Sequence, residues 1–304
     1  MAVAGLLLAG GLLAACGSTP PPSPPVQSSP PTAGPVSSGP SSGDGLATFS
    51  NPSPSPSPVA TPFVLHAGCP TTTHRDANSS HQRGIFAATT NWSGYVARST
   101  KPFSCIQGSW IQPTVTCPAN GSASLAIWIG LDGESGPSRA TLEQIGTNTD
   151  CKNGRGVSFA WFEILPHDRF EQSLGLDIEP GDRIAASIAL VGKSLHLVLE
   201  DVTSGIVRDT LEKAPGARRL TAEWVVEAPT VGCPNDCQVA LLASFSTINF
   251  RSARAILAGV TGPIGDLRWT RVRLTLESRS GLVKAKPGTL GTDGASFAVI
   301  WHHR

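Results

Sequence analysis

Beyond residue 85 the apolar and polar residues of the chain alternate over short stretches, and clusters of Gly, Pro, Asn and Asp interrupt them. Alternation with a period of two predicts strands, because successive side chains of a strand point to opposite faces. In the segment 125–132, Leu or Ile occupies every odd position, while Ala126, Trp128, Gly130 and Asp132 take the other face. No window predicts an amphipathic helix. The pattern is therefore typical of an all-β sandwich or barrel.

Two further stretches predict a hairpin. Apolar residues alternate over 184–190, after a turn at Pro180-Gly181-Asp182, and again over 195–199. The intervening Gly192-Lys193 has the composition of a tight turn, so the two stretches are expected to pair antiparallel. The alternation returns at 272–274 and closes the chain at 297–301.

The segment 222–228 carries charge on a strand-like run. Period-two alternation places Glu223, Val225 and Glu227 on one face, and Trp224 and Val226 on the other. The Trp224 face is expected to lie in the core, so that the two glutamates face a surface or a groove. The pattern alone favours a solvated strand face without any catalytic role.

The first residues, MAVAGLLLAGGLLAAC, form an apolar run that is too short to span a bilayer. Leu13-Ala14-Ala15-Cys16 resembles a bacterial lipobox, so residues 1–16 are expected to be a lipoprotein signal peptide that leaves Cys16 lipidated. A plain signal peptide is the alternative. Residues 17–62 are rich in Pro, Ser and Gly, and they predict a disordered tether. Residues 63–304 then form one domain, held outside the cell at the membrane by the lipid anchor.

Composition excludes some classes of function. The formal net charge is +1, so no basic surface predicts binding to nucleic acid. Only 15% of residues are charged, which suits an acidic environment, since few carboxylates are available to be protonated as the pH falls.

Six cysteines follow Cys16, and in an exported domain an even number predicts three disulfides, with 15 possible pairings. A metal site formed by Cys69, His74 and His81 matches no common zinc spacing, so no metal is expected.

Common catalytic patterns are not found. The expected domain, residues 63–304, has no G-x-S-x-G and no H-E-x-x-H sequence. A glycosidase would need two carboxylates at most about 9.5 Å apart, whereas Glu223 and Glu227 are separated by about 13 Å along a strand. Such an enzyme would need Asp132 or Glu163 from another strand as the partner of Glu223.

The ordered set of motifs resembles the glutamic peptidases, or eqolisins, in a bacterial form. The motifs are, in chain order, Asn91-Trp92-Ser93-Gly94-Tyr95, Gly108-Ser109-Trp110-Ile111-Gln112-Pro113, Trp128-Ile129-Gly130-Leu131-Asp132-Gly133, Leu142-Glu143-Gln144-Ile145-Gly146-Thr147, Ala160-Trp161-Phe162-Glu163, Pro180-Gly181-Asp182, Ala222-Glu223-Trp224-Val225-Val226-Glu227, and Ala295-Ser296-Phe297 through Trp301. Their unbroken order from residue 87 to 301 makes the set more specific than any one motif.

The resemblance implies a sandwich of two bent antiparallel sheets, concanavalin-like or jelly-roll in type, with a polypeptide substrate in the concave groove. It implies Glu223 as general base and Gln144 as the amide that positions the water and stabilises the oxyanion. The substrate-binding positions that it implies are Trp92, Trp128, Asp132 and Glu227. Endopeptidase activity at acidic pH, without metal or cofactor, is the expected function, and a monomer is the expected state.

Among the possible disulfides we expect Cys117–Cys151 between two groove-forming segments, Cys233–Cys237 across a short loop, and Cys69–Cys105 at the start of the domain. Two other functions stay open: a lectin-like cell-surface binding module on the same sandwich, and a glycosidase. A sugar-binding module has no need of both Gln144 and Glu223, so the peptidase is favoured.

Overall fold

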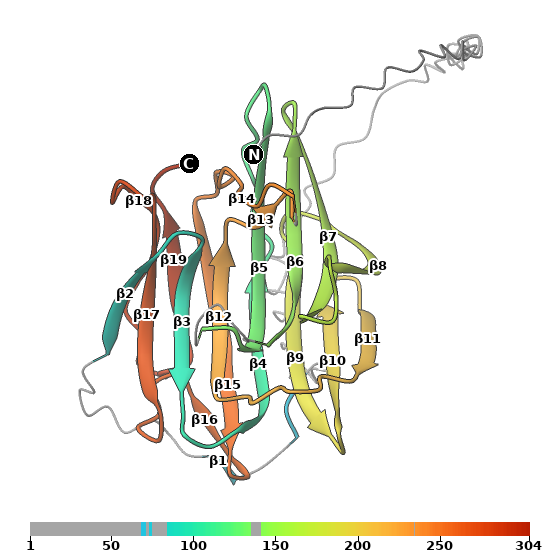
Figure 1. The fold of residues 1–304 in the computed structure, drawn as a ribbon, viewed down its shortest axis with the longest axis vertical. Coiled ribbons are helices and arrows are strands. Elements are labelled where there is room, and N and C mark those ends of the chain that lie inside the picture. Colours follow the sequence, from blue (N-terminus) through green and yellow to red (C-terminus); the bar gives the residue numbers. More distant parts are fainter. Residues whose placement is uncertain (1–67, 71–72, 75–83, 135–140, 234) are drawn as a thin grey trace, which may run out of the picture. The chain divides into compact units, whose positions relative to one another are not determined.

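The structure is a computed structural model that describes residues 68–70, 73–74, 84–134, 141–233 and 235–304 (Figure 1). By their contacts, residues 1–60 and 61–304 form two units, and every described residue belongs to the second. The expected signal peptide (1–16), the tether (17–62) and the domain start at residue 63 lie outside the described residues. Across these ranges no helix is long and apolar enough to cross a membrane.

All regular elements of the described ranges are strands, as the alternation predicts. The bounds of the strands are β1 (Thr73–His74), β2 (Ile85–Thr89), β3 (Trp92–Arg98), β4 (Phe103–Ile111), β5 (Ser122–Asp132), β6 (Leu142–Lys152), β7 (Arg155–Leu165), β8 (Gln172–Ile178), β9 (Arg183–Val191), β10 (Ser194–Asp201), β11 (Ile206–Glu212), β12 (Thr221–Glu227), β13 (Thr230–Val231), β14 (Gln238–Val239), β15 (Thr247–Leu257), β16 (Val260–Pro263), β17 (Thr270–Glu277), β18 (Val283–Pro287) and β19 (Phe297–Trp301).

Seventeen of these strands join one large curled sheet, and β13 pairs only with β14. Its pairings form two series. The first runs β8-β7-β6-β5-β12-β3-β17 and continues through β18 and β19 to the first half of β15. The second runs β11-β10-β9-β4, then through the second half of β15 to β16 and β1. Neighbours pair antiparallel except β1 with β16 and β2 with β17.

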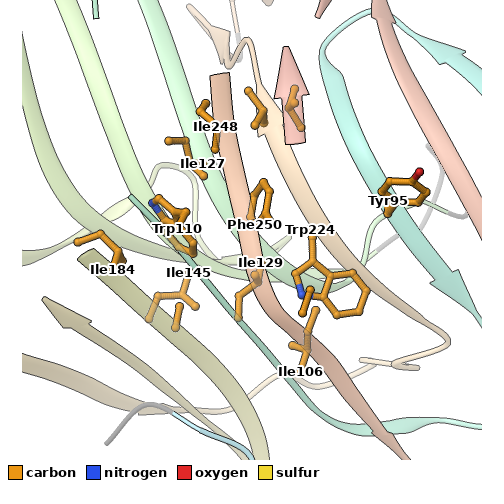
Figure 2. Close-up of a cluster of buried hydrophobic side chains, with 14 of the residues drawn as sticks. Tyr95, Ile106, Trp110, Ile127, Ile129, Ile145, Ile184, Trp224, Ile248 and Phe250 are labelled. Atoms are coloured by element: carbon orange, nitrogen blue, oxygen red, sulfur yellow. The ribbon is translucent and has the colours of Figure 1, made fainter. Parts of the chain in front are cut away.

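The two series pack against each other over the main hydrophobic core (Figure 2). From β5 the odd-numbered residues of the segment 125–131 enter this core, each fully buried, as their alternation predicts. Trp224 and Val226 of β12 enter it as well, and the indole N–H of Trp224 donates to the Gln107 carbonyl of β4 at 2.8 Å. Glu223, Val225 and Glu227 consequently lie on the opposite face of the first series.

The predicted hairpin is confirmed. β9 and β10 pair antiparallel with Val191 opposite Ser194, so Gly192 and Lys193 form the turn. Gly192 has a φ of 63°, in the left-handed region that a two-residue hairpin turn requires and that glycine adopts without steric cost.

Three disulfides link the expected pairs of cysteines. Cys69 is bonded to Cys105 of β4, Cys117 to Cys151 of β6, and Cys233 to Cys237, with Cα–Cα distances of 5.8, 5.3 and 4.5 Å. Because its sulfur is in a disulfide, Cys69 is not the metal ligand of the alternative interpretation.

Candidate active site

Four residues form one row across the first series. The register pairs Glu223 of β12 with Gly130 of β5, Gly130 with Gln144 of β6, and Gln144 with Glu163 of β7. Figure 1 shows these strands side by side in that order. Residues that are directly paired across strands project their side chains from the same face of a sheet. Glu223, Gln144 and Glu163 therefore share the face that points away from the main core.

Gly130, which lies between Glu223 and Gln144 in the row, has no side chain of its own, and the ring of Trp128 lies over it. A Cβ atom at this position would lie 2.8 Å from Cζ3 of Trp128, a distance that side-chain carbons do not tolerate. The ring of Trp128 thus packs directly over the backbone of Gly130. A glycine in the middle of the row is required by this close approach.

The Glu223 carboxyl is fully buried. Its Oε1 accepts hydrogen bonds from the Glu134 backbone N–H and the Thr221 hydroxyl, both at 3.0 Å. Its Oε2 has no hydrogen-bond partner among the described residues. Burial raises the pKa of Glu223 well above its ordinary value, although the two hydrogen bonds to Oε1 act in the opposite direction.

The Gln144 amide is held at one end only. Its Nε2 donates to Oε2 of Glu163 at 2.8 Å, while its Oε1 is buried and has no partner among the described residues. Buried polar atoms without a partner are rare in folded proteins, and each needs a physical explanation. The row holds two of them, Oε2 of Glu223 and Oε1 of Gln144, on residues whose chemistry suits hydrolysis.

The expected substrate-binding residues Trp92, Trp128 and Glu227 contact one another next to this row. The two indole rings meet edge to face with their centroids 5.0 Å apart. Trp128 is fully buried, and its indole N–H donates to Oε2 of Glu227 at 2.7 Å, while the Asn91 amide donates to Oε1 at 3.1 Å. Burial raises the pKa of Glu227 to about 7, against the lowering effect of the Trp128 hydrogen bond. Their binding role stays a prediction.

Asp132, the remaining expected substrate-binding residue, lies where β5 ends. Its φ of 64° lies in the left-handed region, and β5 ends at this residue. Its carboxylate accepts hydrogen bonds from the backbone N–H groups of Arg218, Arg219 and Leu220, at 2.5 to 2.9 Å, and from the Thr141 hydroxyl at 3.2 Å. The side chain is buried, and these contacts tie the approach to β12 onto the end of β5.

Two features of the site could not be found from the sequence pattern. The contact of Glu163 with Gln144 depends on the β6–β7 register, and the sequence indicated Glu163 only as a possible glycosidase partner of Glu223. The cover over Glu223 comes from Gly133 and Glu134. For the contact of Glu163 with Gln144, the only sequence signal was the motif Ala160-Trp161-Phe162-Glu163. For the cover over Glu223, the sequence around Gly133 gave no signal.

The row disfavours the glycosidase interpretation. Glu223 and Glu163 are three strand spacings apart, roughly 14 Å, whereas glycosidases need carboxylates at most about 9.5 Å apart. The other possible partner, Asp132, has its carboxylate engaged with backbone N–H groups.

Comparison with known proteins identifies the family of the chain. The model of the peptidase A4 family matches residues 90–277, which is more than half of the chain. The protein belongs to the peptidase A4 family. It is therefore a peptidase, a hydrolase of peptide bonds, and the resemblance to the glutamic peptidases is confirmed.

Solved structures show the same fold. Two structures of Scytalido-glutamic peptidase, with transition-state analogues, superimpose with TM-scores of 0.59 and 0.60 at 20% identity, over 70% of this chain and 98% of theirs. SCP-B, described as a member of the eqolisin family and bound to the tripeptide Ala-Ile-His, gives a TM-score of 0.56 at 19% identity over the same shares. No curated protein sequence matches the chain significantly.

Proposed function

We propose that this peptidase is an endopeptidase that works at acidic pH, with Glu223 as general base and Gln144 as the group that orients water and stabilises the oxyanion. The observation that carries the proposal is the row itself. Glu223 and Gln144 lie on one face with only a glycine between them, and each has a buried oxygen without a partner among the described residues.

The chemistry balances with these two side chains. A water oxygen attacks the carbonyl carbon of the scissile bond while the Glu223 carboxylate takes one proton from that water. An N–H of Gln144 donates to the oxygen on which negative charge develops, and this amide adds no titrating group. Glu223 then gives its proton to the amine nitrogen as the carbon–nitrogen bond breaks.

The raised pKa of Glu223 has two effects on this cycle. It makes the ionised carboxylate a stronger base, and it also reduces the fraction that is ionised at low pH. In this structure Gly133 and Glu134 cover the carboxyl. These residues have to separate from Glu223 for a substrate to reach it, and contact with water then lowers its pKa toward the ordinary value.

The substrate is a polypeptide, and we propose that it lies across the face formed by Trp92, Trp128 and Glu227. Trp92 is only partly buried and meets Trp128 edge to face, so its ring offers an apolar surface to a substrate side chain. Asp132 is proposed to act on this face indirectly, because its carboxylate already accepts three backbone N–H groups.

We also propose a type of sandwich for the fold and a cellular location for the protein. The two series would form the two bent sheets of a concanavalin-like or jelly-roll sandwich, a proposal that the shared core supports. Lipidation of Cys16 after cleavage, with residues 17–62 as a tether, would hold a monomeric enzyme at the outer side of a bacterial membrane. The lipobox-like Leu13-Ala14-Ala15-Cys16 supports this location.

Digestion of a denatured protein tests the proposed function. Purified protein is expected to cleave the substrate internally between pH 2 and pH 6, at bonds identified by mass spectrometry, and pepstatin is not expected to inhibit it. The Glu223→Gln protein, assayed at equal concentration, is the matched control. Equal cleavage by both proteins would refute the assigned mechanism.

A further inference from the structure

We infer that Glu163 is a positioning residue, which fixes the end of the Gln144 amide that faces the reacting atoms. This inference rests on the proposed role of Gln144 and gives the fourth member of the row a function. The geometry behind it is the single bond from Nε2 of Gln144 to Oε2 of Glu163 at 2.8 Å, between residues that are directly paired on β6 and β7.

A glutamine amide has two ends that are alike in shape and opposite in chemistry. The nitrogen carries two donors, and the oxygen accepts. A half-turn about the last side-chain bond exchanges them at little steric cost, so neighbouring hydrogen bonds decide the orientation. An ionised carboxylate only accepts, and Glu163 in that form therefore selects the nitrogen of Gln144 and rejects the oxygen.

This selection leaves the right groups available for hydrolysis. One N–H of Gln144 is used by Glu163, so the second N–H and the unpartnered Oε1 remain. The second N–H is the donor that the oxyanion requires, and Oε1 is an acceptor for a hydrogen of the attacking water. With the amide turned round, the oxygen would face Glu163, and two acceptors would oppose each other.

The selection depends on the charge of Glu163. A protonated Glu163 has an O–H that donates to an amide oxygen, so both orientations of Gln144 become possible. Burial raises the pKa of Glu163, the hydrogen bond from Gln144 lowers it, and the nearby charge of Asp168 raises it. Glu171, before β8, and Glu227, from β12, are the other acidic groups whose charges interact with it. Loss of order in the Gln144 amide is therefore expected as the pH falls through the pKa of Glu163.

Kinetics of four variants test the inference: Glu163→Gln, Gln144→Ala, the double variant, and Glu179→Gln as the matched control. The last makes the same chemical change on an exposed side chain of the turn after β8, and its activity is expected to match the wild type. In Glu163→Gln, kcat is expected to fall by about tenfold, less than the roughly 10²–10³-fold typical of losing an oxyanion donor. KM is expected to change by less than about twofold, since the effect falls on the transition state.

The double variant separates positioning from a merely structural effect. If Glu163 acts through Gln144, then Glu163→Gln lowers kcat in the wild-type background and leaves it unchanged in the Gln144→Ala background. Equal factors in both backgrounds would overturn the inference.

NMR spectroscopy tests the hydrogen bond between Gln144 and Glu163 independently of enzyme activity. The side-chain amide signals of Gln144, identified by their loss in Gln144→Ala, are expected to shift with pH as Glu163 titrates and to stay constant in Glu163→Gln. Signals that do not move in the wild type would overturn the inference even if the enzyme is active. Failure of the proposed function looks different: Glu223→Gln would retain hydrolysis while the Gln144 signals still follow Glu163.

Discussion

Glu223 and Gln144 project from the same face of the sheet two strands apart, and the backbone of Gly130 is all that the row places between them. A methyl group on Gly130 would lie 2.8 Å from the Trp128 ring and 3.1 Å from the Glu143 carbonyl oxygen. We expect Gly130→Ala to displace that ring toward the row. Overpacking of this kind costs about 1–3 kcal/mol in the free energy of unfolding, and activity should fall as well.

Gly288→Ala is the control for this change, because its Cβ would meet nothing closer than the Ala298 carbonyl oxygen at 3.5 Å. Thermal melting and kcat/KM are measured for both variants. A Gly130→Ala enzyme that melts and cleaves like Gly288→Ala would contradict the described packing.

Glu223→Gln is expected to abolish hydrolysis and leave the fold intact, since the amide is nearly isosteric with the carboxyl but cannot accept a proton. General acid–base catalysis contributes about 10²–10⁴-fold, so at least that loss in kcat is expected. Glu227→Gln should have a smaller effect, because Glu227 accepts hydrogen bonds from Trp128 and Asn91 and lies outside the row. Circular dichroism checks the fold, and an equal loss in both variants would argue against Glu223 as the only base.

Glu143 should make the fold less stable as the pH rises. Its side chain is fully buried and points into the core beside Leu131 and Ile164. Burial, with the nearby charge of Asp132, raises its pKa from 4.5 to about 8. The folded state therefore holds the proton more tightly than the unfolded state, so this contribution is complete below pH 4.5 and is lost as the pH rises through 8.

Melting temperatures of wild type and Glu143→Gln, measured from pH 4 to pH 9, test this expectation. The amide does not ionise, so the variant should lose less stability than the wild type across this range. The melting temperature of the variant should still fall somewhat as the pH rises, because Glu227 and Glu163 also have raised pKa values. Parallel curves would mean that Glu143 does not titrate in the folded state.

Asp132→Asn distinguishes a structural role from direct contact with substrate. The asparagine NH₂ group would oppose backbone N–H donors, and each buried donor left unpaired costs about 1–3 kcal/mol. We expect a lower melting temperature with KM nearly unchanged. Asp209→Asn, which breaks an exposed pair with His196, should have little effect on either value. A raised KM at unchanged stability would favour direct substrate binding by Asp132.

Cys16→Ser tests the proposed anchor. Wild-type protein is expected to partition with membranes and to carry acyl chains that mass spectrometry detects. The variant should be released or remain unprocessed, with the specific activity of the purified enzyme unchanged. Wild-type protein found only in the medium, without lipid, would refute the anchor and leave the catalytic mechanism untouched.

The sequence predicts which side chains of a strand point to the core, but it does not predict which strands lie next to one another. Alternation was enough to assign Trp224 and Val226 to the core and Glu223 to the other face, because a period of two depends only on local backbone geometry. It could not predict that β12 lies between β3 and β5, since that choice depends on packing between distant segments.

The same limit explains the burial of Glu223. A charged residue on the outer face of a strand is ordinarily expected in water or at a groove. Here Gly133 and Glu134, at the end of another strand, cover it. The carboxylate of Asp132 is likewise buried, because the backbone N–H groups of Arg218, Arg219 and Leu220 close over it. Both side chains are covered at the end of β5 by backbone that comes from another part of the chain, which a local period of two does not reveal.

The position of β12 also determines the order in which the row is completed as the chain folds. β5, β6 and β7 follow one another and pair as neighbours, so Gln144 and Glu163 meet early along the chain. Glu223 joins them only after β12 has inserted between β3 and β5, and β3 has its other neighbour in β17, later still. Contacts between distant segments form late in folding because long loops have to close first. A partly folded chain therefore brings Gln144 and Glu163 together before Glu223 completes the row.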